Sequence, residues 1–436
     1  MYFSGKNMKI PYSAQFEIEE GCTHKCLHCY NESPSVKRNL KSASKEIIDA
    51  VSKEDIFSIV LTGGEPLLAG PKIKYALRKF SDSNMDISIN TNLYLLNRGH
   101  IESFKEFDID GVLTSILGPN ASVHDSITGV RGSFYRVLNS LEQLVSNDIK
   151  ASANMVVLPQ NKEFVYETGK MLMDKVGLRV FCATPVVPNY DLSINNLLTK
   201  KEYIGALDDL LALSKDHGIF TDVLHPTLPC IFDSEKQREE YQYFLKNRAC
   251  GAAQSTLTIS ADGGVRPCSH SDKVYGNILE SPLIEIIGKM GKWVNKKLTP
   301  ANCDPCTYEQ YCGGGCRVSS EVISGDIDGQ HHYMGSPIVG KENVLRESKK
   351  MPNFHSLEKI SKNLKFRKEK DGLYSVFADL ESNAIVDDVG MGIVRRFSSG
   401  ASYEDIVNNL DNEKKSLIDN RVEYLFNKGL LVSSSN

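Results

Sequence analysis

The sequence predicts an α/β fold: a partial (β/α)6 barrel, followed by a cysteine-rich domain and a small winged-helix-like α+β domain. Three observations predict this. Short β-like runs alternate with helical patterns in the first part of the chain, nine of the eleven cysteines fall into two groups, and a hairpin signal precedes three helical stretches near the C-terminus. With 436 residues, the chain is long enough for two or three domains.

The barrel is expected from six strands separated by amphipathic helices. One helix is predicted to begin at Ser133 as its N-cap, and another carries apolar residues from Phe164 to Leu172. Strands that alternate with helices favour a parallel sheet, whose chemistry lies at the C-terminal strand ends. The predicted strands are Gln15–Ile18, Ser58–Thr62, Ile87–Thr91, Gly111–Ser115, Ala151–Leu158 and Arg179–Ala183.

The remaining elements follow in order. A helix over Lys201–His217 ends at Gly218 as its C-cap, and regular periodicity then fades between Cys250 and Cys316. Near the C-terminus we expect strands at Leu364–Glu369 and Leu373–Ala378 around an Asp371-Gly372 turn, and then three helices, one opened by a Ser402–Asp405 capping box. The expected domains are residues 1–225, 226–340 and 363–436, with a linker at 341–362.

Composition narrows the class of protein. A net charge of −4 gives no general reason to expect nucleic acid or an anionic membrane as partner. No apolar run approaches the roughly 20 residues of a membrane span, and Met1–Tyr12 lacks an apolar signal core, so we expect a cytoplasmic protein. In a reducing cytosol, clustered cysteines are more often metal ligands than disulfides.

The first cysteine group has the spacing C-x3-C-x2-C. Cys22, Cys26 and Cys29 follow the first predicted strand and would share one loop. An iron–sulfur cubane usually takes four cysteines, so three leave one iron open for a chelating substrate. A structural zinc site is the alternative for the triplet alone, with His24 or His28 as its fourth ligand.

The turn Gly63-Gly64-Glu65-Pro66 directly follows the second predicted strand. Glycines let the backbone approach a ligand closely, and the Glu65 carboxylate can accept hydrogen bonds from an ammonium group. Together with the triplet after the preceding strand, this turn disfavours the zinc interpretation.

With both motifs present, the sequence resembles the radical S-adenosylmethionine (SAM) superfamily. The resemblance implies a [4Fe–4S] cluster held by the three catalytic cysteines, whose open iron binds the amino and carboxylate groups of SAM. Electron transfer to the sulfonium then yields methionine and a 5′-deoxyadenosyl radical that abstracts hydrogen from the substrate. It also implies an electron donor of the flavodoxin or ferredoxin type.

The resemblance assigns further SAM contacts. His28 would pack near the adenine, and the Gly63–Pro66 turn would meet the methionine amino group. Thr91-Asn92 resembles the family's Thr-Asn-Gly, with Leu93 in place of the glycine. Arg131 is either a partner of the SAM carboxylate or a surface arginine. The remaining candidates for ribose, carboxylate or adenine contacts are Ser115, Asn154 and Leu158.

The second cysteine group resembles the SPASM domain of the same superfamily, which implies one or two auxiliary iron–sulfur clusters. Six cysteines and a Gly313-Gly314-Gly315 run carry the resemblance. It implies that the ligands pair across the sequence. The first set would be Cys250, Cys268 and Cys316, and the second set would be Cys303, Cys306 and Cys312.

The chain departs from the SPASM pattern at the fourth ligands. Met334 stands where the family has a further cysteine, so Asp328, His331 or His332 would substitute, or the second cluster would be open or labile. In the first set, Cys230 would complete the cluster, or the open iron would bind a substrate thiolate. A loop cysteine without a ligand role is the alternative for Cys230, and we expect Cys182 to be a core residue.

The C-terminal segment suggests a winged helix, but residues 363–436 hold 10 Lys and Arg against 12 Asp and Glu, so no basic nucleic-acid surface is expected. The segment also resembles a peptide-recognition domain of the pyrroloquinoline-quinone chaperone type. The matching stretches are Asp388–Val394, Gly400–Ile406 and Tyr424–Leu430. This resemblance implies that the leader of a precursor peptide adds a strand to the hairpin edge. A helical cap that only buries core is the alternative.

These features predict radical modification of a ribosomally made precursor peptide, giving a thioether or carbon–carbon cross-link or an epimerised residue. One rival is a sulfatase-maturase-like enzyme; those relatives have an Asp where this chain has Ser269, and they lack the C-terminal unit. Others are a cofactor- or tetrapyrrole-modifying enzyme and a non-enzymatic zinc-binding regulator.

Overall fold

The computed structural model describes residues 8–31, 41–188, 197–245, 250–295, 297–340, 357–359, 364–379, 382–408 and 410–433. The chain forms two compact units. The larger comprises Ala14–Glu54 and Ile59–Leu345, and the smaller comprises Met1–Ser13, Asp55–Ser58 and Arg346–Asn436. Among the helices within the described ranges, none is both long and apolar enough to cross a membrane.

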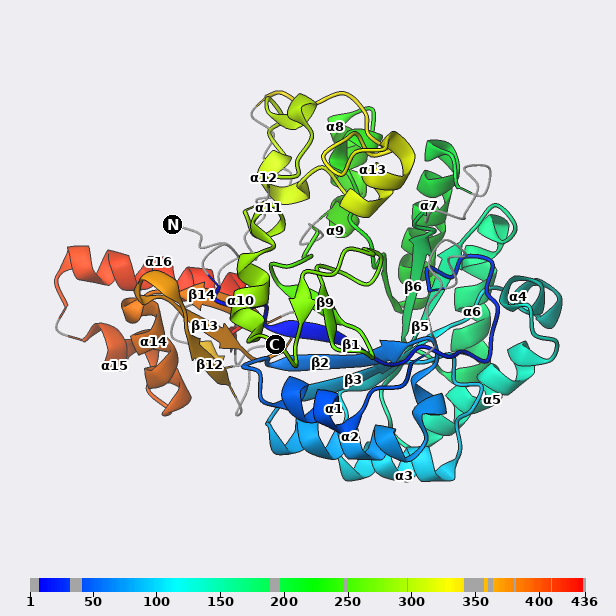
Figure 1. Cartoon of the computed structure of the whole chain (residues 1–436). Coiled ribbons are helices and arrows are strands. Elements are labelled where there is room, and N and C mark those ends of the chain that lie inside the picture. The colour runs from blue at the N-terminus through cyan, green and yellow to red at the C-terminus, as the bar shows by residue number, and fades with distance from the viewer. Residues whose placement is uncertain are drawn as a thin grey trace. The chain divides into compact units, whose positions relative to one another are not determined.

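The larger unit is built on one ten-stranded sheet in the order β10-β9-β8-β1-β2-β3-β4-β5-β6-β7, and the strand pairs from β3 to β7 are parallel (Figure 1). The strands are β1 Ser13–Glu19, β2 Ser58–Gly63, β3 Asp86–Asn90, β4 Gly111–Ser115, β5 Ala151–Val157, β6 Val180–Pro185, β7 Phe220–Asp222, β8 Thr256–Ile259, β9 Gly264–Arg266 and β10 Gly276–Asn277.

The six predicted barrel strands are present as β1 to β6, within two residues at each end. The sheet is wider than predicted, because β7 extends one edge and β8 to β10 extend the other. The added strands have only two to four residues. A strand this short shows too few alternations to stand out in the sequence.

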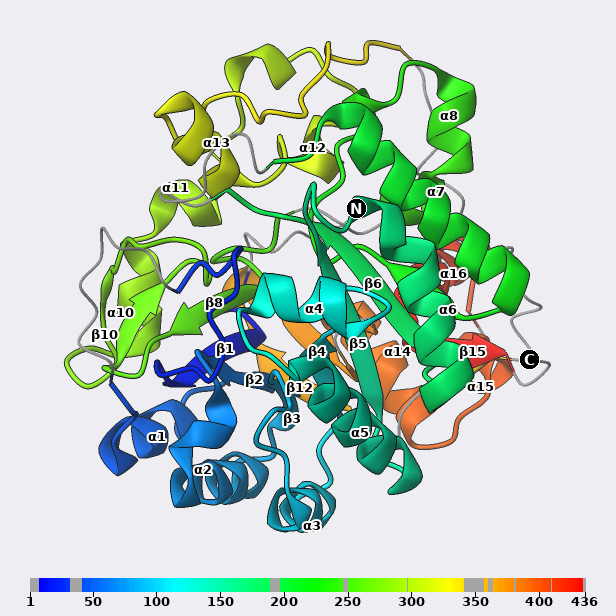
Figure 2. The same ribbon diagram turned by 90° about the vertical axis from the view of Figure 1, so that its right-hand side faces the viewer.

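Helices flank the parallel part of the sheet. Figures 1 and 2 show α1 to α3 along one side of β1 to β3, and α5 and α6 beside β5 and β6. These helices are α1 Lys45–Ser52, α2 Pro71–Asp82, α3 Arg98–Glu106, α4 Ala121–Thr128, α5 Ser133–Ser146, α6 Val165–Val176 and α7 Lys200–His217. The predicted end of α7 is confirmed, with Gly218 in the left-handed conformation at φ 63°.

One helix start was predicted one residue too late. Gly132 is the N-cap of α5 and Ser133 is its first residue. The side chain of Ser133 is fully buried and bonds two histidines instead of the helix backbone. This tertiary contact outweighs the usual capping preference of serine.

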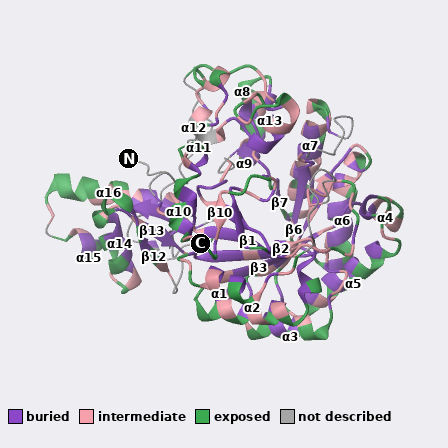
Figure 3. Ribbon diagram, in the orientation of Figure 1, coloured by how far each residue is buried: buried purple, intermediate pink, exposed green. Residues whose placement is uncertain are grey.

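The core of the larger unit lies between the sheet and its helices. Figure 3 shows the strands as buried and the outward faces of the helices as exposed. Phe16, Ile59, Leu61 and Ile89 are inaccessible to solvent. Because β3 to β7 pair in parallel, their C-terminal ends lie at the same end of the sheet, where loop side chains can meet.

The cysteine-rich part of this unit is made of short elements. Besides β8 to β10 it contains 3₁₀ turns at Pro229–Ile231 and Ala301–Cys303. Its helices are α8 Glu235–Glu240, α9 Gln242–Leu245, α10 Leu283–Gly288, α11 Gly291–Val294, α12 Glu309–Cys312 and α13 Arg317–Ser324.

The smaller unit contains a three-stranded antiparallel sheet, β12 Lys365–Lys368, β13 Tyr374–Phe377 and β14 Asn383–Val386, with β13 in the centre. The predicted turn is confirmed, with Asp371 at φ 56° and Gly372 at φ 73°. The Ser402–Asp405 capping box is also present. The other elements are β11 Leu357–Lys359 paired with β15 Leu431–Ser433, and helices α14 Asp388–Ser398, α15 Tyr403–Val407 and α16 Asn412–Asn427.

Residues from the start of the chain belong to this smaller unit. The buried Arg367 donates hydrogen bonds to the carbonyls of Ile10 and Asp55, each at 2.6 Å, and bonds the Glu369 carboxylate at 2.6 Å. The ring of Phe377 packs on Tyr12 at 5.5 Å between centroids. Segments far apart in sequence therefore share one small core.

Candidate active site

The first cysteine triplet lies in the loop after β1. Cys22 is exposed, whereas Cys26 and Cys29 are half-buried. Two backbone bonds hold this loop against the end of α4, from the Lys25 N–H to the Thr128 carbonyl at 2.9 Å and from the Leu27 N–H to the Ile127 carbonyl at 3.0 Å. The three thiols are thus carried by a braced segment.

A buried chain of polar groups fixes His24 within that loop. The Leu117 N–H donates to Nδ1 of His124, so in the neutral ring Nε2 carries the hydrogen and donates to Ser133 Oγ at 3.2 Å. The Ser133 hydroxyl then donates to Nε2 of His24 at 2.9 Å. Burial lowers the pKa of His24 to about 4. The Nε2 lone pair of His24, one of the two ligand groups weighed for zinc, is engaged by Ser133.

The two glycines of the Gly63–Pro66 turn are required by backbone packing. A Cβ on Gly63 would lie 2.1 Å from the Glu19 carbonyl oxygen, and one on Gly64 would lie 2.3 Å from the carbonyl oxygens of Glu20 and Gly21. The Gly64 N–H donates to Glu19 and the Glu65 N–H donates to Gly21, both at 2.7 Å. The turn therefore fixes the segment that leads into Cys22.

Glu65 joins the ends of two strands. Its buried carboxylate accepts hydrogen bonds from the Leu67 N–H at 2.9 Å, the Thr91 hydroxyl at 2.6 Å and the Asn92 N–H at 2.8 Å. Burial raises its pKa to about 7, against the opposing effect of these donors. The structure thus gives Glu65 a positioning role that sequence analysis did not predict.

Asn92 lies beside the first cysteine. Its Nδ2 donates to Thr23 Oγ1 at 3.0 Å and lies 3.6 Å from Cys22 Sγ. The next residue, Leu93, has φ 59° and is fully buried. This left-handed conformation explains why glycine suits the position in the family pattern.

The other candidate SAM contacts lie on neighbouring strands. Ser115 at the end of β4 is paired with Asn154 on β5, and Asn154 Oδ1 accepts a hydrogen bond from Thr184 at 2.8 Å. His28 is half-buried, and its Nδ1 is buried without a hydrogen-bond partner among the described residues. Arg131 is exposed in the turn before α5.

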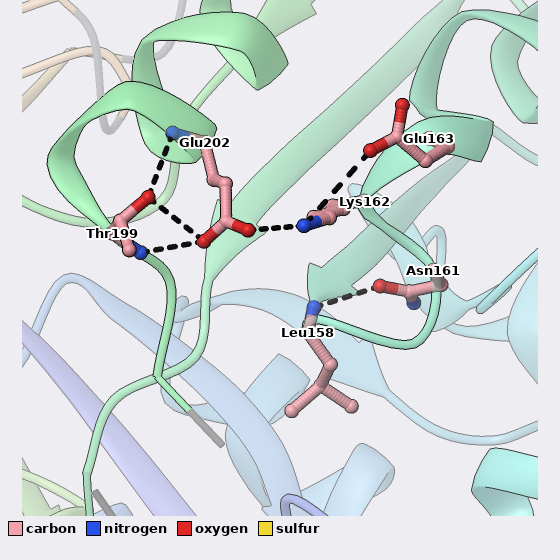
Figure 4. Close-up of polar contacts among 6 residues, drawn as sticks. All are labelled: Leu158, Asn161, Lys162, Glu163, Thr199 and Glu202. Carbon is pink, nitrogen blue, oxygen red and sulfur yellow. Dashed lines mark hydrogen bonds and ion pairs between the residues drawn. The ribbon is translucent and has the colours of Figure 1, made fainter. Parts of the chain in front are cut away.

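Leu158 follows β5 in a small apolar cluster with Leu117, Ile127, Val186 and Leu197. Its N–H donates to Asn161 Oδ1 at 2.7 Å, and the following residues are tied to α7 through Lys162 and Glu202 (Figure 4). Glu202 also completes a capping box with Thr199. These contacts hold the loop at the C-terminal end of β5 in place.

The second cysteine group separates into two sets in space. In the first set, the charges of Cys250 and Cys316 both act on Cys268, whose pKa is raised to about 12 chiefly by burial. Burial also favours the neutral form of Cys316, but a hydrogen bond and the charge of His225 outweigh it and hold the pKa of Cys316 at about 7. Nε2 of the buried His225 has no partner among the described residues.

The second set comprises Cys303, Cys306 and Cys312, which line one pocket together with Cys230. Sequence analysis weighed Cys230 for the first set, and the structure places it with the second. Of the groups weighed for the second set, Asp328 is exposed, and His331 and His332 stack on each other 4.4 Å apart. His331 faces His225, at 5.9 Å between ring centroids.

A buried arginine lies between the two sets. Arg317 donates to the carbonyls of Leu298, Gly315 and Gly329, and the charges of Cys316 and Cys312, one from each set, act on it. Sequence analysis did not single out Arg317 or His225. The signal that would have identified Arg317 is its position directly after the ligand cysteine Cys316.

The triplet loop and the second group are in contact within the larger unit. The ring of Tyr30, next to Cys29, packs on His270 at 4.4 Å between centroids. A buried ion pair joins Glu17 of β1 to Arg266 of β9 at 2.5 Å, and Arg266 also donates to the carbonyl of Ser269. Neither contact was predicted, since each joins residues far apart in sequence.

The thiols of the triplet and of the two later sets are the ligand type that iron–sulfur clusters take. Within the described residues, no group of three or more His, Cys, Asp or Glu side chains is placed to hold a single metal ion.

Comparison with known proteins agrees with this site chemistry. Residues 16–172 match the Radical SAM superfamily, and residues 250–313 match the SPASM iron–sulfur cluster-binding domain. The chain is therefore a radical SAM enzyme with a SPASM domain, and its cofactors are SAM and [4Fe–4S] clusters.

The similar proteins have different named functions. The chain is 25% identical over 343 residues to the AdoMet-dependent heme synthase of Methanosarcina barkeri, covering 74% of this chain and 96% of that protein. It is 25% identical over 350 residues to the antilisterial bacteriocin subtilosin biosynthesis protein AlbA of Bacillus subtilis, covering 71% and 68%. Among solved structures, Streptococcus suis SuiB bound to the precursor peptide SuiA matches with a TM-score of 0.58 and 15% identity, covering 78% and 77%.

Proposed function

We propose that this enzyme modifies a residue of a ribosomally made precursor peptide by a radical reaction that begins with reductive cleavage of SAM. One observation carries the radical part: the ends of β1, β2 and β3 converge through Gly64, Glu65 and Asn92 beside Cys22. The peptide part is supported by the bacteriocin-biosynthesis relative and by the similar fold of a protein bound to a precursor peptide.

In this proposal Cys22, Cys26 and Cys29 hold the catalytic cluster, which supplies the electron that breaks the C–S bond of SAM. The Gly63–Pro66 turn, Thr91 and Asn92 shape the methionine side of the site. Ser115 and Asn154, paired on neighbouring strands, face the ribose or carboxylate. His28 and Leu158 contact the adenine, and Arg131, which is exposed in the turn before α5, pairs with the SAM carboxylate.

The residues around the triplet hold the loop in place. Neutral His24 receives the Ser133 hydroxyl hydrogen, so no proton has to be gained or lost there near neutral pH. Glu65 fixes the ends of β2 and β3 through three donors. A rigid site of this kind keeps the reacting groups oriented.

The smaller unit is the proposed leader-recognition domain, since an edge strand can accept an extended peptide. The two edge strands of the sheet are β12 and β14. Side chains of β12 and the adjacent Glu369 form hydrogen bonds with residues 9–11 and 55, so β14 is the favoured edge for a peptide. In the described part of the unit, no strand pairs with the outer side of β14. The leader would then lie along β14 in an extended conformation.

A tetrapyrrole-modifying enzyme is the second candidate. The heme synthase relative favours it, because the match covers nearly the whole of that protein. The two candidates share the radical step and differ in substrate. Leader binding by the smaller unit and an assay with both substrates therefore distinguish them.

The radical step is tested with the triple variant Cys22→Ala, Cys26→Ala, Cys29→Ala. Anaerobically reconstituted wild type should form 5′-deoxyadenosine from SAM under a strong reductant, and the variant should form none. The wild type is then given either a short peptide encoded beside its gene or an iron porphyrin, and products are followed by mass spectrometry. SAM cleavage that survives in the triple variant would contradict the radical assignment, and a modified porphyrin with an unmodified peptide would favour the second candidate.

Leader binding needs a probe on the edge strand. Val376→Pro is unsuitable because Val376 is fully buried in the central strand and pairs with both Phe366 and Ala384. Deletion after Ser361 is also unsuitable, because it removes the partners of Ile10 and Tyr12.

Ile385→Pro is the better probe. The Ala378 N–H donates to the Ser382 carbonyl and Ile385 pairs with Ser375 in the same ladder, so by antiparallel alternation the Ile385 N–H points away from β13. Proline should weaken leader binding roughly three- to tenfold, the effect of one lost backbone hydrogen bond. Ile385→Val is the matched control and should bind like wild type in fluorescence anisotropy. Equal leader affinity for both variants would argue against strand addition at β14.

A further inference from the structure

We propose that Cys230 is the fourth thiolate of the second auxiliary cluster, replacing the downstream cysteine that this chain lacks. Cys230 lies in the 3₁₀ turn Pro229–Ile231, upstream of both cysteine sets. It nevertheless lines the same pocket as Cys303, Cys306 and Cys312. The inference rests on the proposed cluster ligands and adds one to them.

Packing explains how Cys230 takes the position of the missing ligand. The Gly335 N–H donates to Cys230 Sγ at 3.3 Å. A Cβ on Gly335 would lie 2.1 Å from the Cys230 carbonyl oxygen, so the two segments approach as closely as glycine allows. Residue 334, where the family has its further cysteine, is thus packed directly against the turn that carries Cys230.

The other pocket groups are weaker candidates. The Met334 thioether is a poor cluster ligand, and its sulfur lies 3.6 Å from Asn302 Nδ2. The Glu309 carboxylate is a hard donor, whereas thiolates are the usual ligands of iron–sulfur clusters. The described residues that line the pocket do not include Asp328, His331 or His332.

Four thiolates would leave this cluster without an open iron. It would then transfer electrons or hold the fold together, and it would not bind substrate. The first set has only three cysteines, with His225 hydrogen-bonded to one of them. Any direct contact between an auxiliary cluster and the substrate therefore belongs to the first set.

The test compares Cys230→Ala with two matched controls in the triple-alanine background of the catalytic triplet, where only auxiliary clusters remain. Cys182→Ala removes a buried cysteine on β6, and Met334→Leu removes the thioether sulfur that lines the pocket. After anaerobic reconstitution, Cys230→Ala should lose iron and sulfide or show a three-iron cluster by electron paramagnetic resonance, while both controls keep the parent's content.

A second measurement does not depend on how a variant folds. In iron-loaded full-length protein, Cys230 should be protected from iodoacetamide together with Cys303, Cys306 and Cys312, and all four should be labelled after the iron is removed. The inference is overturned if Cys230 is labelled equally before and after iron removal, or if only Met334→Leu loses iron. Failure of the proposed function would appear separately, as SAM cleavage that persists in the triple-alanine protein.

Discussion

At the residue scale, two glycines show how a motif can be explained by packing before ligand binding is considered. Sequence reasoning assigned Gly63 and Gly64 to close approach of a ligand, and in the structure the backbone at the end of β1 and just after it also approaches both glycines. Glu65 likewise binds strand ends with its carboxylate. The motif therefore builds the loop that presents Cys22.

Gly64→Ala should abolish SAM binding and lower the midpoint of thermal unfolding, because the new methyl group would lie 2.3 Å from two carbonyl oxygens. Isothermal titration with SAM and a thermal melt measure both effects. Gly205→Ala is the control, since no heavy atom lies within 4 Å of its added Cβ. In the interior of α7 that change should stabilise the helix by up to about 1 kcal/mol. Normal SAM affinity in Gly64→Ala would contradict the packing explanation.

At Leu93 the chain has a non-glycine residue in a left-handed backbone conformation, where the family pattern has glycine. A non-glycine residue in the left-handed conformation costs roughly 1–2 kcal/mol. Complete burial of a leucine side chain contributes about 1.5–3 kcal/mol in compensation, which makes Leu93 tolerable where the family pattern has glycine.

At the element scale, the start of α7 is stabilised by contacts that also hold the loop after β5. The Glu202 carboxylate accepts hydrogen bonds from Thr199 and Lys162, and the Lys162 bond, the largest contribution, lowers the pKa of Glu202 to about 2 (Figure 4). A carboxylate whose pKa is lower in the folded state stabilises the fold above its unfolded pKa, near 4.5, and loses that contribution as pH falls towards 2.

Glu202→Gln should therefore destabilise the protein by up to about 1 kcal/mol at neutral pH, because glutamine can keep the capping-box bond but loses the partly exposed ion pair with Lys162. The difference from wild type should shrink as the pH falls from 4.5 towards 2, which urea unfolding at several pH values measures. Glu163→Gln is the control. The Glu163 side chain is 80% exposed, and its carboxylate lies 4.0 Å from the same lysine, at the limit of an ion pair. A difference that stays constant with pH would contradict the assigned pKa.

At the scale of the whole molecule, the smaller unit is assembled from three parts of the chain. Arg367 of β12 joins them, since it bonds the carbonyls of Ile10 and Asp55 as well as the Glu369 carboxylate. Both members of this ion pair are at most 3% exposed. Breaking a buried pair by removing one partner leaves an uncompensated charge.

Arg367→Met should destabilise the smaller unit by about 3–5 kcal/mol. Hydrogen exchange should then rise in residues 8–13 and 364–386 together, because they share one core. Lys368→Met is the control, being the exposed neighbour on the same strand. Increased exchange confined to residues 364–386 would show that the N-terminal segment is held independently.

The sequence by itself determined the six barrel strands and the capping box at Ser402. It also determined the helix end at Gly218, the turn at Asp371-Gly372, and the cysteine and glycine motifs of a radical SAM enzyme. Each of these depends on spacing or on backbone preference within a few residues. Only the tertiary structure decided that Cys230 joins the second cysteine set, that Ser133 bonds two histidines, that Glu65 is enclosed by three donors, and that Ile10 and Asp55 bond Arg367. These contacts join residues distant in the chain, and periodicity and local propensity carry no information about which distant segments will pack together.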